Sequence, residues 1–280
     1  MIFIVGIVCL LIVSSYSSNN IYTNILNDIN NNRMVVDKSP KASAPPTVAI
    51  TSPMGGEFFD ATAPDFIVEI SDAVNPIDKM WYTIDGGATN ITFTTNGTID
   101  QNNWTALADG SITLTFYANN SISEVDFASV SINKDTGVPT VAIISPTGGE
   151  YFDATAPDYV VEISDSGSPI DTMWYTIDGG ATNITFTVNG TIDQNNWTAL
   201  ADGPVTIIFY ANDSVGNDNS AQVIVNKDVL DPTVSITSPT GGEYFDATAP
   251  GFTVEITDDN RDTMWYTIDG GATNITFTAN

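Results

Sequence analysis

Three residue types are scarce or missing in this sequence, and each absence narrows what the protein can be. There is no histidine, so the commonest general base and metal ligand of enzymes is missing. The only cysteine, Cys9, lies in an apolar N-terminal run, so no disulfide can form within one chain. Seven lysine and arginine residues stand against 34 aspartate and glutamate residues. The resulting net charge of −27 excludes nucleic acid as a partner, because binding to phosphate needs clustered cations.

An apolar run opens the chain. Residues 2–13 (IFIVGIVCLLIV) are fewer than the roughly 20 residues that a relaxed helix needs to span a bilayer. Their number and the serines that follow are typical of a secretory signal, although no lysine or arginine precedes the run. We expect residues 1–18 to be a signal peptide or short anchor and residues 19–45 to be a polar linker.

A repeat with a period of 93 residues organises the rest of the chain. Pro46, Pro139 and Pro232 lie in closely similar stretches (PPTVAITSP, VPTVAIISP and DPTVSITSP), and DGGATNITFT occurs three times. The third copy stops at the position that matches Asn96 of the first. The predicted domains are module 1 at 46–138, module 2 at 139–231 and an incomplete module 3 at 232–280.

Within each copy, short segments alternate apolar and polar residues, which predicts half-buried strands. In the first copy, Phe66, Val68 and Ile70 share one face, and six such segments precede the next repeat, with a further short strand near residues 57–59. About 93 residues with seven or so strands is the size of an immunoglobulin-like sandwich. The predicted fold class is therefore all-β: tandem Ig-like antiparallel β-sandwiches with Greek-key connections.

The connections between strands carry their own signals. Asp85-Gly86-Gly87 predicts a hairpin, because a type I′ turn needs positive φ at its central residues. Asp100 is placed to cap a short helical turn that Gly110 would end, pressing Trp104 onto one end of the core. The strand tryptophans Trp81, Trp174 and Trp265 fall outside by strict alternation, whereas sandwiches often bury a tryptophan, so both orientations stay open.

The residues resemble a known class of module. DPTVSITSP at the start of a copy, MWYTIDGGATNITFT in its middle and ADGPVTIIFYANDSVGN before its last strand are similar to the immunoglobulin-like or fibronectin-III-like repeats of bacterial and archaeal surface proteins. The resemblance implies spacer or adhesive modules in large secreted chains. It carries no fixed catalytic residues and names no ligand.

The sequence also contains candidate sites for glycosylation and for a bound cation. The glycosylation sequon N-x-S/T occurs at Asn90, Asn96, Asn103, Asn119, Asn183, Asn189, Asn196, Asn212 and Asn274, and abundant Asn and Thr also produce sequons by chance. No cofactor is expected, with the possible exception of Ca²⁺, which takes six to eight oxygen ligands. The candidate calcium ligands are Asp213, Asn217, Asp218, Asp228 and Asp231, against the alternative of a solvated acidic loop.

Catalysis finds no support in these residues. There is no Gly-rich phosphate loop, no G-x-S-x-G and no thiol after residue 9, and paired carboxylates arise by accident where Asp is abundant. We expect a non-catalytic extracellular spacer or stalk of a cell-surface or S-layer-type protein. The alternative is an adhesin that binds glycans or a partner protein. Neighbouring modules are the first expected partners, and the membrane is reached only through the N-terminal segment or an anchor beyond residue 280.

Overall fold

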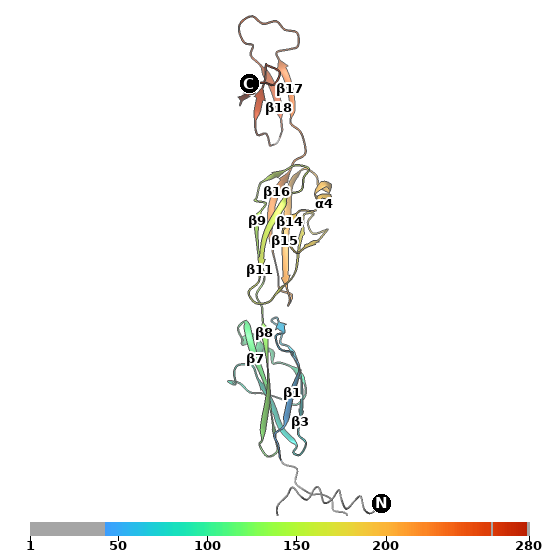
Figure 1. Cartoon of the computed structure of the whole chain (residues 1–280), viewed down its shortest axis with the longest axis vertical. Coiled ribbons are helices and arrows are strands. Elements are labelled where there is room, and N and C mark those ends of the chain that lie inside the picture. Colours follow the sequence, from blue (N-terminus) through green and yellow to red (C-terminus); the bar gives the residue numbers. More distant parts are fainter. Residues whose placement is uncertain (1–42, 259, 279–280) are drawn as a thin grey trace, which may run out of the picture.

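The computed structural model describes residues 43–258 and 260–278, and Figure 1 shows three bodies arranged end to end along its longest axis. The predicted signal peptide or anchor, Cys9 and most of the polar linker lie outside these residues. Among the described residues, no helix has the length and apolar character needed to cross a membrane.

The first two bodies repeat one order of elements. Module 1 contains β1 (Thr47–Ser52), β2 (Phe58–Phe59), β3 (Asp65–Ser71), β4 (Ile77–Thr83), β5 (Ile91–Phe93), β6 (Gly97–Thr98), α3 (Gln101–Ala106), β7 (Gly110–Asn120) and β8 (Val125–Lys134). Module 2 contains β9 (Thr140–Ser145), β10 (Tyr151–Phe152), β11 (Asp158–Ser164), β12 (Ile170–Thr176), β13 (Ile184–Phe186), β14 (Gly190–Thr191), α4 (Gln194–Ala199), β15 (Gly203–Asp213) and β16 (Asp218–Lys227).

Each of these modules is a sandwich of two sheets. In module 1, a three-stranded sheet of order β1-β3-β6 faces a five-stranded sheet of order β2-β8-β7-β4-β5. Module 2 has the same two sheets, with orders β14-β11-β9 and β10-β16-β15-β12-β13. In module 1 the chain changes sheet after β1, β2, β3, β5 and β6. All strand pairs of the described residues are antiparallel except β2–β8 and β10–β16. The predicted all-β fold of tandem Ig-like sandwiches is confirmed.

Alternation along the strands sets the core of each module. In β3, Phe66 and Val68 are buried while the residues between them are exposed, as a period of two requires. They meet Leu114 and Phe116 of β7 in one apolar cluster, and the short predicted strand near residues 57–59 is present as β2. Each sandwich therefore has a core of its own, and module 2 repeats it with Tyr159 in place of Phe66.

A short helix closes one end of each core. Asp100 caps α3, because its side chain accepts a hydrogen bond from the backbone N–H of Asn103, as predicted. The helix ends at Leu107 rather than at Gly110, where β7 already begins with a φ of 122°. Trp104 on this helix is fully buried, and its indole N–H donates to the carbonyl of Asp60.

The Asp-Gly-Gly stretch connects β4 to β5 as predicted, but over residues 84–90 rather than through a two-residue turn. Gly86 and Gly87 have φ of 73° and 97°, a conformation that favours glycine. In module 2, the Asp178 carboxylate accepts hydrogen bonds from the Thr176 hydroxyl and the Thr182 backbone N–H. The carboxylate therefore stabilises the loop by connecting its two ends through hydrogen bonds.

This loop predicts an acid-sensitive contribution to stability. Hydrogen bonds from the Thr182 backbone, and then from the Thr176 and Thr182 side chains, lower the pKa of Asp178 to about 2. A carboxyl group whose pKa is lowered on folding stabilises the fold above its unfolded pKa, and this contribution is lost as the pH falls from about 4 to about 2. We expect Asp178→Asn to flatten the dependence of the urea midpoint of module 2 on pH in that window. A variant whose pH dependence matches the parent would contradict this account.

The third body contains only paired strands in the described residues. β17 (Thr233–Ser238) pairs with β18 (Thr253–Thr257), and β19 (Met264–Tyr266) pairs with β20 (Ile275–Phe277). Phe252, Tyr266 and Phe277 contact one another as their counterparts do in module 1. This part of the chain reproduces the first half of the module with the same registers.

Candidate functional site

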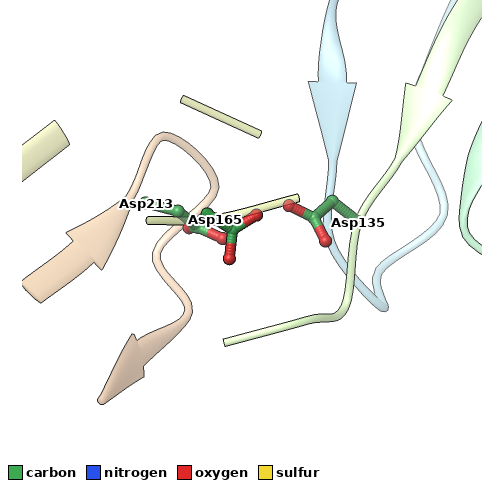
Figure 2. Close-up of side chains that lie close together, drawn as sticks. All are labelled: Asp135, Asp165 and Asp213. Atoms are coloured by element: carbon green, nitrogen blue, oxygen red, sulfur yellow. The ribbon is translucent and has the colours of Figure 1, made fainter. Parts of the chain in front are cut away.

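Three aspartates meet where module 1 joins module 2. Asp135 directly follows β8, Asp165 directly follows β11, and Asp213 is the last residue of β15. One carboxylate oxygen from each lies within 4.8 Å of the other two, and Figure 2 shows the Asp135 side chain pointing across the junction toward Asp165 and Asp213. Two modules therefore contribute to a single cluster.

Backbone N–H groups fix the orientation of each carboxylate. Gly137 donates to Oδ1 of Asp135 at 3.0 Å, and Gly167 donates to Oδ1 of Asp165 at 2.7 Å. The Oδ1 atom of Asp213 accepts from the N–H groups of Val215 at 3.0 Å and Asn217 at 2.8 Å. The three acids are thus positioned by tight loops and not by free rotation, which pre-forms the cluster.

Two oxygens in this region are buried without a partner. Asp135 is only 2% exposed, and its Oδ2 atom has no hydrogen-bond donor. Ser168, three residues after Asp165, is 5% exposed, and its Oγ atom has no hydrogen bond of normal geometry, although the hydroxyl lies close enough to Asp213 to help lower the pKa of that carboxyl group. A buried carboxylate oxygen without a donor is costly, because its lost hydration is not replaced.

The ionised form of Asp213 is nevertheless favoured. Burial alone would raise the pKa of this carboxyl group, but hydrogen bonds from the side chain and backbone of Asn217, together with the Val215 backbone, lower it below its ordinary value. Lysine does not neutralise the cluster: the Nζ atoms of Lys134 and Lys227 donate to helix carbonyls instead. The site can therefore attract a cation.

Another polar contact joins the two modules here. The side-chain amide of Asn217 donates to the backbone carbonyl of Asp135 at 3.3 Å. Within module 2, the amide of Asn219 donates to the carbonyl of Pro139 at 2.8 Å, which holds the start of that module. Gly167 lies directly against the Asp135 carboxylate, because a Cβ atom at position 167 would collide with it. A larger residue at position 167 would therefore displace the Asp135 side chain.

The chain is similar to several known solved structures, at low sequence identity. Fibronectin(III)-like modules of CbhA from Clostridium thermocellum match with 19% identity over 65% of this chain and 94% of theirs, with a TM-score of 0.35. A 1.5-MDa bacterial ice-binding adhesin, described for host cell surface retention, matches with 15% identity over 70% and 71%, with a TM-score of 0.39. A tetra-tandem repeat from the extending region of a large adhesion protein matches with 17% identity over 72% and 54%, with a TM-score of 0.31. No protein-family model and no curated protein sequence matches the chain.

The calcium ligands expected from the sequence are distributed over three places. Asp213 belongs to the junction cluster and Asn217 donates to it, whereas Asp218 is exposed at the start of β16 and is not among the cluster's carboxylates. Asp228 and Asp231 line a separate hollow at the start of module 3. The sequence did not single out Asp135 or Asp165, although Asp135 is the counterpart of Asp228 one period earlier.

The sequons also differ in their surroundings. Asn90, Asn183 and Asn274 are exposed just before β5, β13 and β20. In contrast, the Oδ1 atoms of Asn96, Asn189 and Asn212 accept backbone hydrogen bonds. The amides of Asn103 and Asn119 donate to nearby carboxylates, and Asn196 is half-buried on α4. Glycosylation of these asparagines stays a prediction.

Two of the strand tryptophans, Trp81 and Trp174, lie on the outer face of the five-stranded sheets, and Trp265 lies on β19 of a two-stranded sheet. Trp81 stacks on Tyr117 with ring centroids 5.3 Å apart, and Trp174 stacks on Tyr210 at 5.2 Å. Both tryptophans are half-buried, whereas Trp265 is 56% exposed. Strict alternation therefore places the strand tryptophans correctly, and the buried tryptophan of each complete module comes from its helix.

Proposed function

We propose that the chain is a non-catalytic extracellular spacer, in which rigid sandwiches are joined end to end to hold another part of the protein away from a surface. The observation that carries the proposal is the joint between modules 1 and 2, where Asn217 donates to the carbonyl of Asp135 and Gly167 lies against the Asp135 carboxylate. Contacts of this kind favour one relative orientation of the modules over free rotation. A spacer needs length and stiffness, and the near-identical cores supply both without distinct binding surfaces.

The proposal predicts an extended chain in solution. The longest strand of each module has 11 residues, so one module measures at least about 36 Å along its strands, and two modules about 70 Å. With Cys9→Ser in the background, spin labels at Ser121→Cys and Ala199→Cys, which lie at the far ends of modules 1 and 2, should be about 70 Å apart by pulsed electron resonance. A distribution centred well below this distance would show folded-back modules and overturn the spacer function.

The outer aromatic residues favour one alternative, an adhesin that binds glycans or a partner protein. In module 1, Trp81, Tyr117 and Phe127 form a row of rings, and Phe127 is 59% exposed. Aromatic faces bind sugars by stacking. A glycan array probed with the full chain separates the two functions: a clear hit that Phe127→Ala abolishes would favour the adhesin, and an array without hits favours the spacer.

A further inference from the structure

We propose that the joint between modules 1 and 2 is a calcium site, with Asp135, Asp165 and Asp213 as its carboxylate ligands. Three carboxylate oxygens lie within 4.8 Å of one another, in a region where two of the three residues are almost fully buried. The Oδ2 atom of Asp135 has no donor, so the structure leaves a negatively charged ligand atom free for a cation. In biological terms this inference rests on the proposed spacer function, because a bound ion would stiffen the joint.

Three carboxylates held by loops fit calcium better than magnesium. Their oxygens lie within 4.8 Å of one another, close to the spread that bonds of about 2.3–2.6 Å to one Ca²⁺ require. Mg²⁺ demands near-ideal octahedral geometry and gives up its water reluctantly, so it is seldom held by protein side chains alone. The buried hydroxyl of Ser168 is a further oxygen beside Asp165. Water completes the coordination shell of six to eight oxygens.

Module 1 contains the same loops in a form that needs no ion. The counterpart of Asp213 is Asn120, whose amide donates to Oδ2 of Asp72 at 2.9 Å and to Oε2 of Glu124 at 2.9 Å. In module 2 the amide and the carboxylate change places: Asp213 stands where module 1 has Asn120, Asn217 stands where it has Glu124, and the Asn217 amide donates to Oδ2 of Asp213 at 2.8 Å. The loop position beside Asp165 therefore holds a carboxylate in module 2 and an amide in module 1, and Asp135 of module 1 adds a third carboxylate there.

A second difference between the copies opens the space for Asp135. Position 167 is glycine in module 2, whereas its counterpart one period earlier is Val74. Because a Cβ atom at position 167 would collide with the Asp135 carboxylate, valine cannot occupy this position while Asp135 reaches the cluster. The two changes therefore act together. Gly167 leaves room for the Asp135 carboxylate of module 1, and Asp213 supplies a carboxylate from module 2.

Calcium titration of the full chain, after removal of ions with EDTA, tests the site by calorimetry up to about 1 mM, a range that covers extracellular calcium modules. Asp213→Asn and Gly167→Val introduce the residues that module 1 carries, so both are expected to fold, and each should remove one bound Ca²⁺ per chain. Asp72→Asn changes the counterpart of Asp165 in module 1 and is the matched control, expected to bind as many ions as the parent. Mg²⁺ should bind more weakly than Ca²⁺.

Thermal melting supplies an independent measurement. Ca²⁺ should raise the melting temperature of the parent but not of Asp213→Asn. The site would be refuted by a parent that binds no Ca²⁺, by an Asp213→Asn variant that binds the same number of ions, or by equal affinity for Mg²⁺. The label distance separates the two hypotheses: a long distance without calcium binding refutes the site alone, and calcium binding with a short distance refutes the spacer function alone.

Discussion

Trp197→Ala is expected to lower the free energy of unfolding of module 2 by about 3–5 kcal/mol. The side chain is fully buried on α4, and its ring meets Phe152 edge-on at 6.2 Å. Its indole N–H donates to the backbone carbonyl of Asp153, so the substitution leaves both a cavity and an unpaired acceptor. Because a single domain is stable by only about 5–15 kcal/mol, this one change removes a large part of the stability of module 2.

Differential scanning calorimetry of the full chain measures the effect. For a module of this size, a loss of 3–5 kcal/mol corresponds to a fall in Tm of at least about 12 °C. Trp174→Ala in the same module is the matched control, since Trp174 stacks on Tyr210 at the outer face and is half-buried. We expect the control to cost about 1 kcal/mol. Equal losses for the two tryptophans would show that the helix does not close the core.

The repeat made most of this fold predictable from sequence. Alternation within each copy identified the strands that carry Phe66, Val68 and Phe116, because one face of every strand is buried against the other sheet. The cap at Asp100 was also predictable, since a carboxylate before a short helical segment has few other roles. The two-residue strand β6 was missed because it is held by pairing with β3 and not by its own residues.

The junction cluster was predictable only in part. Clusters of acidic residues along the sequence point to Asp213 and Asn217, which one tight loop brings together. The same criterion selected Asp218, but strand β16 begins at this residue and leaves it exposed. Asp135 is separated from Asp213 by most of a module, and its position depends on how one sandwich sits on the next. No local pattern in the sequence carries that information.

A comparison of the two complete modules points to the junction, which local sequence patterns do not. Position by position, module 2 differs from module 1 where Val74 becomes Gly167 and where Asn120 becomes Asp213. Other positions differ as well, among them Val125 and Phe127 of β8, which become Asp218 and Ser220. The changes to Gly167 and Asp213 are informative because they fall at the same end of the module, beside Asp135. Their shared place at the joint, and not their number, indicates a role there.

Lys134→Met is expected to destabilise module 1 by about 3 kcal/mol, the second large effect of a single substitution. Lys134 is 5% exposed, and its Nζ atom donates to the carbonyls of Trp104 at 3.1 Å and Leu107 at 2.6 Å. These carbonyls lie at the C-terminal end of α3, where the Trp104 carbonyl also accepts from the Leu107 N–H but no further helical turn supplies donors. The ammonium group also lies 5.8 Å from the Trp104 ring centroid and so interacts with its π-face.

Methionine fills nearly the same volume but cannot donate, so the loss reports the hydrogen bonds and the charge rather than packing. Lys79→Met is the control within the same module, since Lys79 is exposed on β4, and it should change the unfolding free energy by less than about 0.5 kcal/mol. Chemical denaturation followed by tryptophan fluorescence measures both variants. Equal stability of Lys134→Met and Lys79→Met would contradict this account. It would mean that water can replace the ammonium group as the donor to the helix carbonyls, and that Lys134 does not hold α3 against the end of the sandwich.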